Sequence, residues 1–328
     1  MILVTQSFGN EQEYKRAIFC IASFYAHCED KSSACYLFTD NPDYFQKYLN
    51  DFPIRYFVLT PDKIKAMRGD IDFLHRMKIA LIDEAFEHAD QNLLYADSDT
   101  FFLKDPSEKM SRLRPDISFM HLPEYSFESM RDWMLPAGVP FRAFINLISE
   151  NQFKMPDGSA LKIDTSGYSW NAGVMMLHTS HKKYIPEVYA ITEQSYPFTK
   201  NHACEQYAFS IALQRHTTLH RCDDVSYHYW YRVKKKLADA FLQKEVADFD
   251  IHPIAESFER IRKITQELPL RIENSVVFLK DASIQSFNEN RFFIGYKFAA
   301  RVLVRSPFEY LFIKDILYHT KRMLIFSR

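Results

Sequence analysis

Two aspartates, one residue apart, follow an apolar run and have the clearest chemical potential in this sequence. Residues 92–104 read NLLYADSDTFFLK and contain Asp97, Ser98 and Asp99. If this stretch is a strand, the two aspartates point the same way and Ser98 points oppositely. Two carboxylates so close repel each other unless protons or a cation neutralise them, and Mg²⁺ or Mn²⁺ with oxygen ligands would do so. A solvated turn after the strand is the alternative without function.

The apolar periodicity predicts that the aspartates end one strand of an alternating strand–helix pattern. Strands are expected at residues 1–9, 34–39, 54–60 and 92–104, and a helix at 74–86 leads into the last of them. Near-continuous apolarity around the aspartates is typical of a strand buried on both faces. The pattern predicts an α/β fold with a doubly wound, mostly parallel sheet and flanking helices.

The second half of the chain is less regular. Six prolines break residues 105–165 into expected loops and short helices, and strand character returns at residues 169–178. From residue 237 onward the spacing is mainly helical, with one further strand expected at residues 276–279. We therefore expect a first domain at residues 1–236 and a C-terminal, mainly helical extension at residues 237–328.

Composition excludes several classes of protein. The chain has 328 residues, of which 47% are hydrophobic, so it can bury a full core. Only seven glycines occur, and neither G-x-x-x-x-G-K-[ST] nor G-x-G-x-x-G is found, which argues against a P-loop NTPase or a dinucleotide-binding enzyme. A net charge of −1 gives no indication of a nucleic-acid partner, and none is expected.

Cysteine spacing and hydropathy indicate the cellular compartment of the protein. The five cysteines form no C-x-x-C pair, and reduced thiols are expected. The opening apolar run is too short for a signal peptide, and no stretch of about 18 apolar residues suggests a membrane span. We expect a cytoplasmic protein.

The motifs together resemble glycosyltransferases of the GT-A fold, over about residues 1–236. The token YADSDT resembles the D-x-D that these enzymes place at the end of a central strand, where it holds a divalent ion against the diphosphate of a nucleotide sugar. WNAGVMML at residues 170–177 resembles the F-N-[AS]-G-V strand of the retaining family that includes glycogenin and bacterial lipopolysaccharide galactosyltransferases. His228 and Lys234 keep the spacing of that family's H-x-x-G-x-x-K stretch, although Tyr231 replaces its glycine.

The resemblance implies roles for particular residues. Asp97, Asp99 and His228 would be the metal ligands, and Lys234 would bind phosphate. Glu205 and Gln206 stand where the family has D-Q-D, so that Gln206 would lie near the anomeric carbon and Glu205 would act as a base or orient the sugar hydroxyls. Asn171 is expected to bind the sugar or the acceptor. The expected nucleotide contacts are Thr5, Gln6, Asp40, Arg76, Lys78 and Ser98. For Arg76 and Lys78, simple solvation is the alternative.

The resemblance also implies a reaction. A metal-dependent glycosyltransferase would move a sugar from a nucleotide-diphosphate donor, UDP-hexose being favoured, to a glycan or glycolipid acceptor in surface polysaccharide synthesis, with Mn²⁺ or Mg²⁺ as cofactor. The residues do not choose between retention and inversion.

Three other interpretations of the same residues stay open. A haloacid-dehalogenase-type phosphatase also uses D-x-D, but its threonine comes one position later than Thr100 does here. A nucleotidyltransferase usually opens with a glycine-rich phosphate loop, which this chain lacks. A non-catalytic sugar-nucleotide or glycan binding protein would use the acidic pair for a structural ion.

The last 38 residues interleave basic and aromatic side chains. Such a tail suits peripheral contact with the inner membrane surface, where lipid-linked acceptors occur. Helices packed on the catalytic domain explain it equally well.

Overall fold

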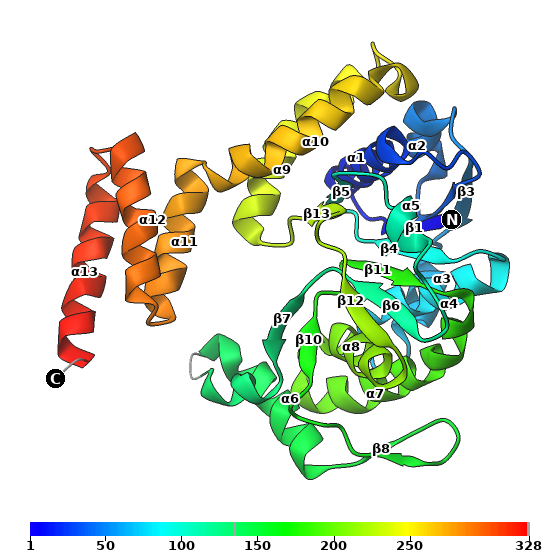
Figure 1. Ribbon diagram of the computed structural model, residues 1–328, viewed down its shortest axis with the longest axis horizontal. Helices are drawn as coiled ribbons and strands as arrows, with labels where there is room; N and C mark the ends of the chain where they lie inside the picture. The colour runs from blue at the N-terminus through cyan, green and yellow to red at the C-terminus, as the bar shows by residue number, and fades with distance from the viewer. Residues whose placement is uncertain (134–135, 327–328) are drawn as a thin grey trace. The chain divides into compact units, whose positions relative to one another are not determined.

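The computed structural model describes residues 1–133 and 136–326. These residues divide into two compact units, one of Met1–His228 with Val246–Arg262 and one of Tyr229–Glu245 with Lys263–Arg328. The domain division expected at residue 236 stays a prediction. The order of the helices and strands is shown in Figure 1.

A mixed sheet forms the centre of the first unit. In spatial order its strands are β12 (Thr218–Arg221), β6 (Ile117–Met120), β11 (Val174–Leu177), β4 (Leu93–Ala96), β1 (Ile2–Ser7), β2 (Ala34–Thr39) and β3 (Ile54–Val58). Neighbours pair in parallel except where β11 runs antiparallel to β4 and β6. The predicted α/β class with a mostly parallel sheet is confirmed.

Helices flank this sheet, as expected from the strand–helix alternation. They are α1 (Glu11–His27), α2 (Pro42–Leu49), α3 (Pro61–Arg68), α4 (Arg76–His88), α5 (Ser107–Met110), α6 (Val139–Glu150), α7 (Ile185–Thr199) and α8 (Cys204–His216). Short 3₁₀ helices lie at η1 (Glu128–Asp132), η2 (Pro136–Gly138), η3 (Thr179–Tyr184) and η4 (Ile254–Ser257). Ile2 and Val4 on one face of β1 join Met77 of α4 in the main core, while Leu3 between them points to the other face.

The first unit also has three two-stranded sheets outside the seven-stranded sheet. They are β5 (Thr100–Phe102) with β13 (Ser226–His228), β7 (Pro123–Ser126) with β10 (Tyr168–Trp170), and β8 (Phe153–Lys154) with β9 (Ala160–Leu161). All three pairs are antiparallel. Two of them reach the candidate site, because β13 brings a histidine beside β5 and β7 brings a glutamate beside the residues that follow β10.

Several predicted strand boundaries differ from the structure. The first strand ends at Ser7 and the third at Val58, each two residues early. The strand expected over residues 169–178 is broken into β10 and β11 by residues 171–173. The helix before the aspartates begins at Arg76, after the half-exposed Leu74.

The C-terminal part is helical, as predicted, with one correction. Its helices are α9 (Arg232–Asp248), α10 (Phe258–Glu273), α11 (Val276–Asn288), α12 (Phe292–Arg305) and α13 (Tyr310–Phe326). The strand expected at residues 276–279 was wrong, because Ser275 caps a helix there by accepting the N–H of Phe278 at 3.1 Å. Leu279, Ser283 and Phe287, each four residues apart, form the buried face of α11.

Two other expectations concern the whole chain. All five cysteines are free and buried. That their thiols are reduced stays a prediction. Among the described residues, no helix has both the length and the apolar character needed to cross a bilayer.

Candidate active site

The two aspartates lie on the turn that joins β4 to β5. Asp97 directly follows β4, and Asp99 directly precedes β5. The N–H of Asp97 donates to the carbonyl oxygen of Gly173 at 2.8 Å, which fixes the start of this turn beside β11. The single strand expected over residues 92–104 was therefore wrong at residues 97–99. A turn, and not strand alternation, brings the two carboxylates near each other.

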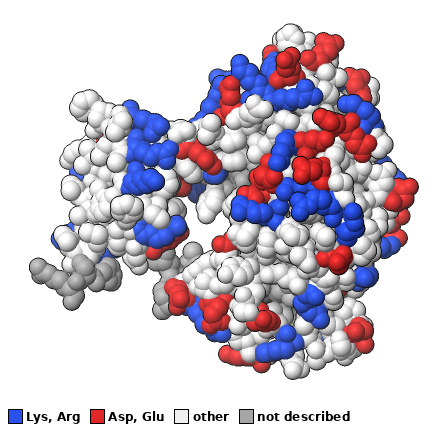
Figure 2. Space-filling view, in the orientation of Figure 1, with Lys and Arg blue, Asp and Glu red and all other residues white. Residues whose placement is uncertain are grey.

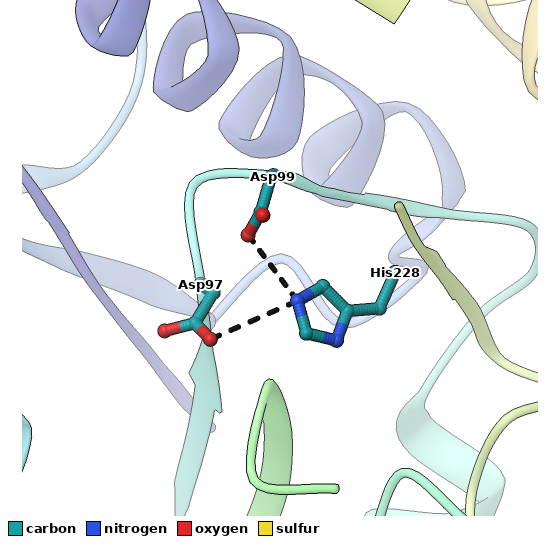
Figure 3. Close-up of side chains that lie close together, drawn as sticks. All are labelled: Asp97, Asp99 and His228. Carbon is teal, nitrogen blue, oxygen red and sulfur yellow. Dashed lines mark ion pairs between the residues drawn. The ribbon is translucent and has the colours of Figure 1, made fainter. Parts of the chain in front are cut away.

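His228 completes a group of three possible metal ligands. It ends β13, where it is paired with Thr100 of β5, so the backbone register places its ring beside the aspartates. Its Nε2 lies 3.2 Å from Asp99 Oδ1 and 3.8 Å from Asp97 Oδ2. Figure 3 shows the ring facing both carboxylates. The possible ligand atoms of the three residues lie within 4.8 Å of one another. Asp99 and His228 are buried, and Asp97 is partly exposed.

This set of donors suits a divalent cation. Two carboxylate oxygens and one imidazole nitrogen are ligands that Mn²⁺ accepts readily, and Mg²⁺ takes them less well because it favours oxygen alone. Gly173 makes room for the ring, because a Cβ at this position would lie 2.0 Å from Cε1 of His228. The predicted ligands therefore converge, and the residues fit the expected metal.

A buried lysine lies next to the aspartates. The ammonium group of Lys78, on α4, is 3.1 Å from Asp97 Oδ2 and 3.7 Å from Glu205 Oε1, and it donates to the carbonyl oxygen of Ala172 at 3.2 Å. Burial alone would lower the pKa of Lys78, but the carboxylates of Asp97 and Glu205 outweigh it and raise the pKa. Lys78 is therefore a fixed positive charge at the site, and its burial rules out the alternative of simple solvation. Its nucleotide contact stays a prediction.

Acidic groups exceed basic ones around Lys78. Asp97, Asp99 and Glu205 all act on its ammonium group. A divalent cation would balance the excess negative charge of this group. Tyr95 adds a further hydrogen bond by donating its hydroxyl proton to Asp97 Oδ1, and burial together with Asp97 raises the pKa of Tyr95 far above its usual range.

Glu205 is the second residue of α8 and is nearly fully buried. Its Oε2 has no hydrogen-bond partner among the described residues. Leaving a buried acceptor unsatisfied costs about 1–3 kcal/mol, and more for a charged group. A hydroxyl of a bound ligand would satisfy this oxygen.

Asn171 and Gln206 are held by one glutamate that the sequence did not single out. Glu124, on β7, accepts from Asn171 Nδ2 at 3.1 Å and from Gln206 Nε2 at 2.8 Å. Gln206 also accepts the N–H of Ala172 at 3.3 Å and donates to Ser169 Oγ at 3.0 Å. Asn171 Oδ1 lies 2.8 Å from Nδ1 of His228. The structure thus links both predicted amides to His228, Asn171 directly and Gln206 through Glu124 and Asn171.

The end of β1 carries unsatisfied polar groups. Thr5 Oγ1, Gln6 Oε1 and Ser7 Oγ are buried and have no hydrogen-bond partner within the described part of the chain. Thr5 and Gln6 were expected to contact the nucleotide. Residues 5–7 are the last three of β1, and in open α/β sheets ligands bind at the carboxyl ends of the strands.

Two further predicted contacts are engaged in local hydrogen bonds. Asp40 accepts the N–H of Gly9 at 2.9 Å and the hydroxyl of Tyr14 at 2.7 Å, so it orders the loop after β1. Ser98 donates to Glu13 Oε2 at 3.2 Å. Their predicted nucleotide contacts stay predictions.

Arg76 and Lys234 have other partners in the structure. Arg76 pairs with Glu193 at 2.7 Å and donates to the carbonyl oxygen of Met67 at 2.7 Å. Lys234 belongs to the second unit, where it pairs with Glu273 at 2.9 Å. The predicted nucleotide contact of Arg76 and the predicted phosphate binding of Lys234 also stay predictions.

Sequence reasoning missed Glu124 and Tyr95 as members of the site. Tyr95 was read only as an apolar strand residue, and Glu124 lies in the proline-rich region expected to form loops. Glu124 comes three positions after the buried His121, which directly follows β6. This was a weak signal, because the partners of Glu124 lie far along the chain.

Glycosyltransferases are among the solved structures to which this chain is similar. Mouse xyloside xylosyltransferase 1 is 13% identical with a TM-score of 0.42, over 68% of this chain and 85% of that chain. The galactosyltransferase LgtC, in complex with donor and acceptor sugar analogs, is 13% identical with a TM-score of 0.47, over 76% and 96%. The glycosyltransferase GlyE of Streptococcus pneumoniae is 13% identical with a TM-score of 0.40, over 76% and 50%. No protein-family model and no curated protein matches the chain.

The close contact of Gly173 with His228 predicts the effect of a methyl group there. In Gly173→Ala the new Cβ would displace the imidazole, and we expect Mn²⁺ affinity to fall at least about ten-fold, as when a ligand loses its support. Isothermal titration of Mn²⁺ measures this. Gly167→Ala is the control, since its Cβ would come no closer than 3.3 Å to a neighbouring atom. Equal Mn²⁺ affinity in both variants would contradict the described ring position.

Proposed function

We propose that this protein is a metal-dependent glycosyltransferase. It would transfer a hexose from UDP-hexose to a glycan or glycolipid acceptor in surface polysaccharide synthesis, using Mn²⁺ or Mg²⁺. The observation that supports this most strongly is the convergence of Asp97, Asp99 and His228 at the end of a central sheet strand. Lys78 and Glu205 lie beside this group, where a donor would be held.

The chemistry explains why such a group is needed. In glycosyl transfer the bond from the anomeric carbon to a nucleoside diphosphate breaks, and the leaving group carries concentrated negative charge. A divalent cation supplies Lewis-acid stabilisation of that charge when it is bound. Asp97, Asp99 and His228 would hold it, and the low exposure of Asp99 and His228 limits competition from water.

Lys78 and Glu205 would form hydrogen bonds with the sugar or the diphosphate of the donor. Lys78 would donate to a phosphate or hydroxyl oxygen from a position fixed by its bond to Asp97. Glu205 Oε2 would accept the proton of a sugar hydroxyl in the hydrogen bond that it lacks within the described chain. Glu205 would thus orient the sugar in a retaining reaction, or act as a base toward the acceptor in an inverting one.

The nucleoside would lie at the ends of β1 and β2. The unsatisfied oxygens of Thr5 and Gln6 support this placement, because a ribose or base has donors that would satisfy them. Asp40 orders the adjacent loop through Gly9 and Tyr14. Ser98 and Arg76 are the remaining contacts that we propose on this side, with Lys234 binding phosphate.

The second unit suggests a peripheral contact with an anionic membrane. Phe293 and Val304 of α12 are 84% and 85% exposed, and Phe308 in the following loop is 95% exposed. Arg301 and Arg305 converge on Asn274 Oδ1 at 2.8 and 3.3 Å, and Figure 2 shows basic side chains on the visible face of this unit. Apolar and basic groups together support binding at a lipid surface, where a glycolipid acceptor would be found.

Titration of UDP into the protein tests the proposed donor site. We expect UDP to bind in the presence of Mn²⁺ and not in EDTA. In the double variant Asp97→Ala, Asp99→Ala the affinity should fall more than about 100-fold, because direct ligands contribute more than supporting residues. The control is Asp51→Ala, Asp70→Ala, which removes the same charge at two exposed positions.

Turnover then separates an enzyme from a binding protein. Release of UDP from UDP-hexose, with or without acceptor, should require the same aspartates. Metal-dependent UDP binding without any turnover of the UDP-hexoses would favour the non-catalytic binding protein. UDP binding that is equal with Mn²⁺ and with EDTA would contradict the proposed metal site.

Flotation with vesicles tests the membrane contact. We expect binding to vesicles that contain phosphatidylglycerol and weaker binding to phosphatidylcholine alone. The variant Phe293→Ser, Phe308→Ser should bind at least about ten-fold more weakly, since burying each phenyl group contributes roughly 1.5–3 kcal/mol. Phe198→Ser is the control because Phe198 is exposed on α7 of the first unit. Absence of the wild-type protein from the floated vesicles would refute the contact.

A further inference from the structure

Glu124 occupies a position that no motif of the sequence explains. It lies on β7, is only partly buried, and uses both carboxylate oxygens within the fold. One oxygen accepts from Asn171 Nδ2 at 3.1 Å and the other from Gln206 Nε2 at 2.8 Å. An ionised carboxylate only accepts hydrogen bonds, so it requires both amides to turn their NH₂ groups toward it.

The two amides therefore turn their oxygens the other way, toward the chain between β10 and β11. Gln206 Oε1 accepts the N–H of Ala172 at 3.3 Å, and Asn171 Oδ1 accepts the N–H of Gly173 at 3.0 Å. These backbone donors agree with the orientation that Glu124 imposes. The amide of Asn171 thus has one orientation that satisfies all its neighbours.

The orientation of Asn171 determines the tautomer of His228. Asn171 Oδ1 lies 2.8 Å from Nδ1 of the ring, and an oxygen can only accept, so Nδ1 must carry the proton. In the neutral ring, Nε2 then has a lone pair, and it faces Asp99 at 3.2 Å and Asp97 at 3.8 Å. A lone pair that faces two carboxylates is suited to a cation.

We infer that Glu124 is a positioning residue that makes His228 a metal ligand. It holds Asn171 with its oxygen toward Nδ1–H, and so leaves Nε2 unprotonated for the metal. If Asn171 turned over, its NH₂ would face Nδ1, the proton would move to Nε2, and the ring could not bind a cation there. The inference deepens the proposed function, since it rests on the cation site of Asp97, Asp99 and His228.

Glu124→Gln is the variant that removes this constraint. Glutamine can donate as well as accept, so it no longer requires the NH₂ of Asn171 to face it. We expect Mn²⁺ affinity to fall about 10- to 100-fold, as is typical when the partner of a metal-bound histidine is lost. The control is Glu128→Gln, since Glu128 is an exposed glutamate two residues beyond the end of β7 and pairs with Arg131.

The tautomer of His228 can be observed without any metal. In protein with ¹⁵N-labelled histidine at about pH 8, above the ordinary pKa of histidine, long-range ¹H–¹⁵N spectra separate the two tautomers. The His228→Gln variant identifies the His228 signal among those of the twelve histidines. We expect Nδ1–H in the wild type and in Glu128→Gln, and a larger share of Nε2–H in Glu124→Gln.

The outcomes distinguish the inference from the proposed function. An Nε2–H tautomer in the wild type would overturn the inference, and this test needs no variant if Glu124→Gln fails to fold. A shifted tautomer with unchanged Mn²⁺ affinity, or an unchanged tautomer in Glu124→Gln, would also overturn it. Failure of the wild type to bind Mn²⁺, with Nδ1–H in place, would instead refute the proposed metal site.

Discussion

The repulsion between neighbouring carboxylates is the constraint on which the site depends. Asp97 and Asp99 are brought together by a turn at the end of a buried strand, and Glu205 lies near the same lysine. Two hydrogen-bond donors reduce this repulsion, because the ammonium group of Lys78 and the hydroxyl of Tyr95 both donate to Asp97. These donors leave an excess of negative charge, and the proposed cation follows from that excess.

The parts of the site predicted well from sequence were those that depend on local spacing. Asp97 and Asp99 are one residue apart, and the strand before them was evident from its apolarity, so their convergence followed directly. His228 was found through its spacing to Lys234, although the structure places Lys234 in the second unit with Glu273 as its partner. The ring position of His228 comes instead from strand pairing between β13 and β5.

The parts that could not be predicted depend on contacts between distant segments. Glu124 acts through Asn171 and Gln206, which come from later parts of the chain, and nothing local marks it. The strand wrongly expected at residues 276–279 has a similar cause. Four consecutive apolar residues fit a strand as well as a helix, and only the cap at Ser275 and the helical spacing to Phe287 indicate the helix. The sheet itself was predicted because its strands and helices alternate regularly. Its antiparallel member β11 was not, since strand direction depends on the chain's path.

The ligand set of the metal is the most direct test of this account. Pulsed electron paramagnetic resonance of Mn²⁺ bound with UDP, in protein with ¹⁵N-labelled histidine, detects nitrogen and phosphorus nuclei next to the ion. The account predicts coupling to one histidine nitrogen, lost in His228→Gln, together with coupling to phosphorus of UDP. Bound Mn²⁺ without histidine coupling, or with coupling that persists in His228→Gln, would contradict it.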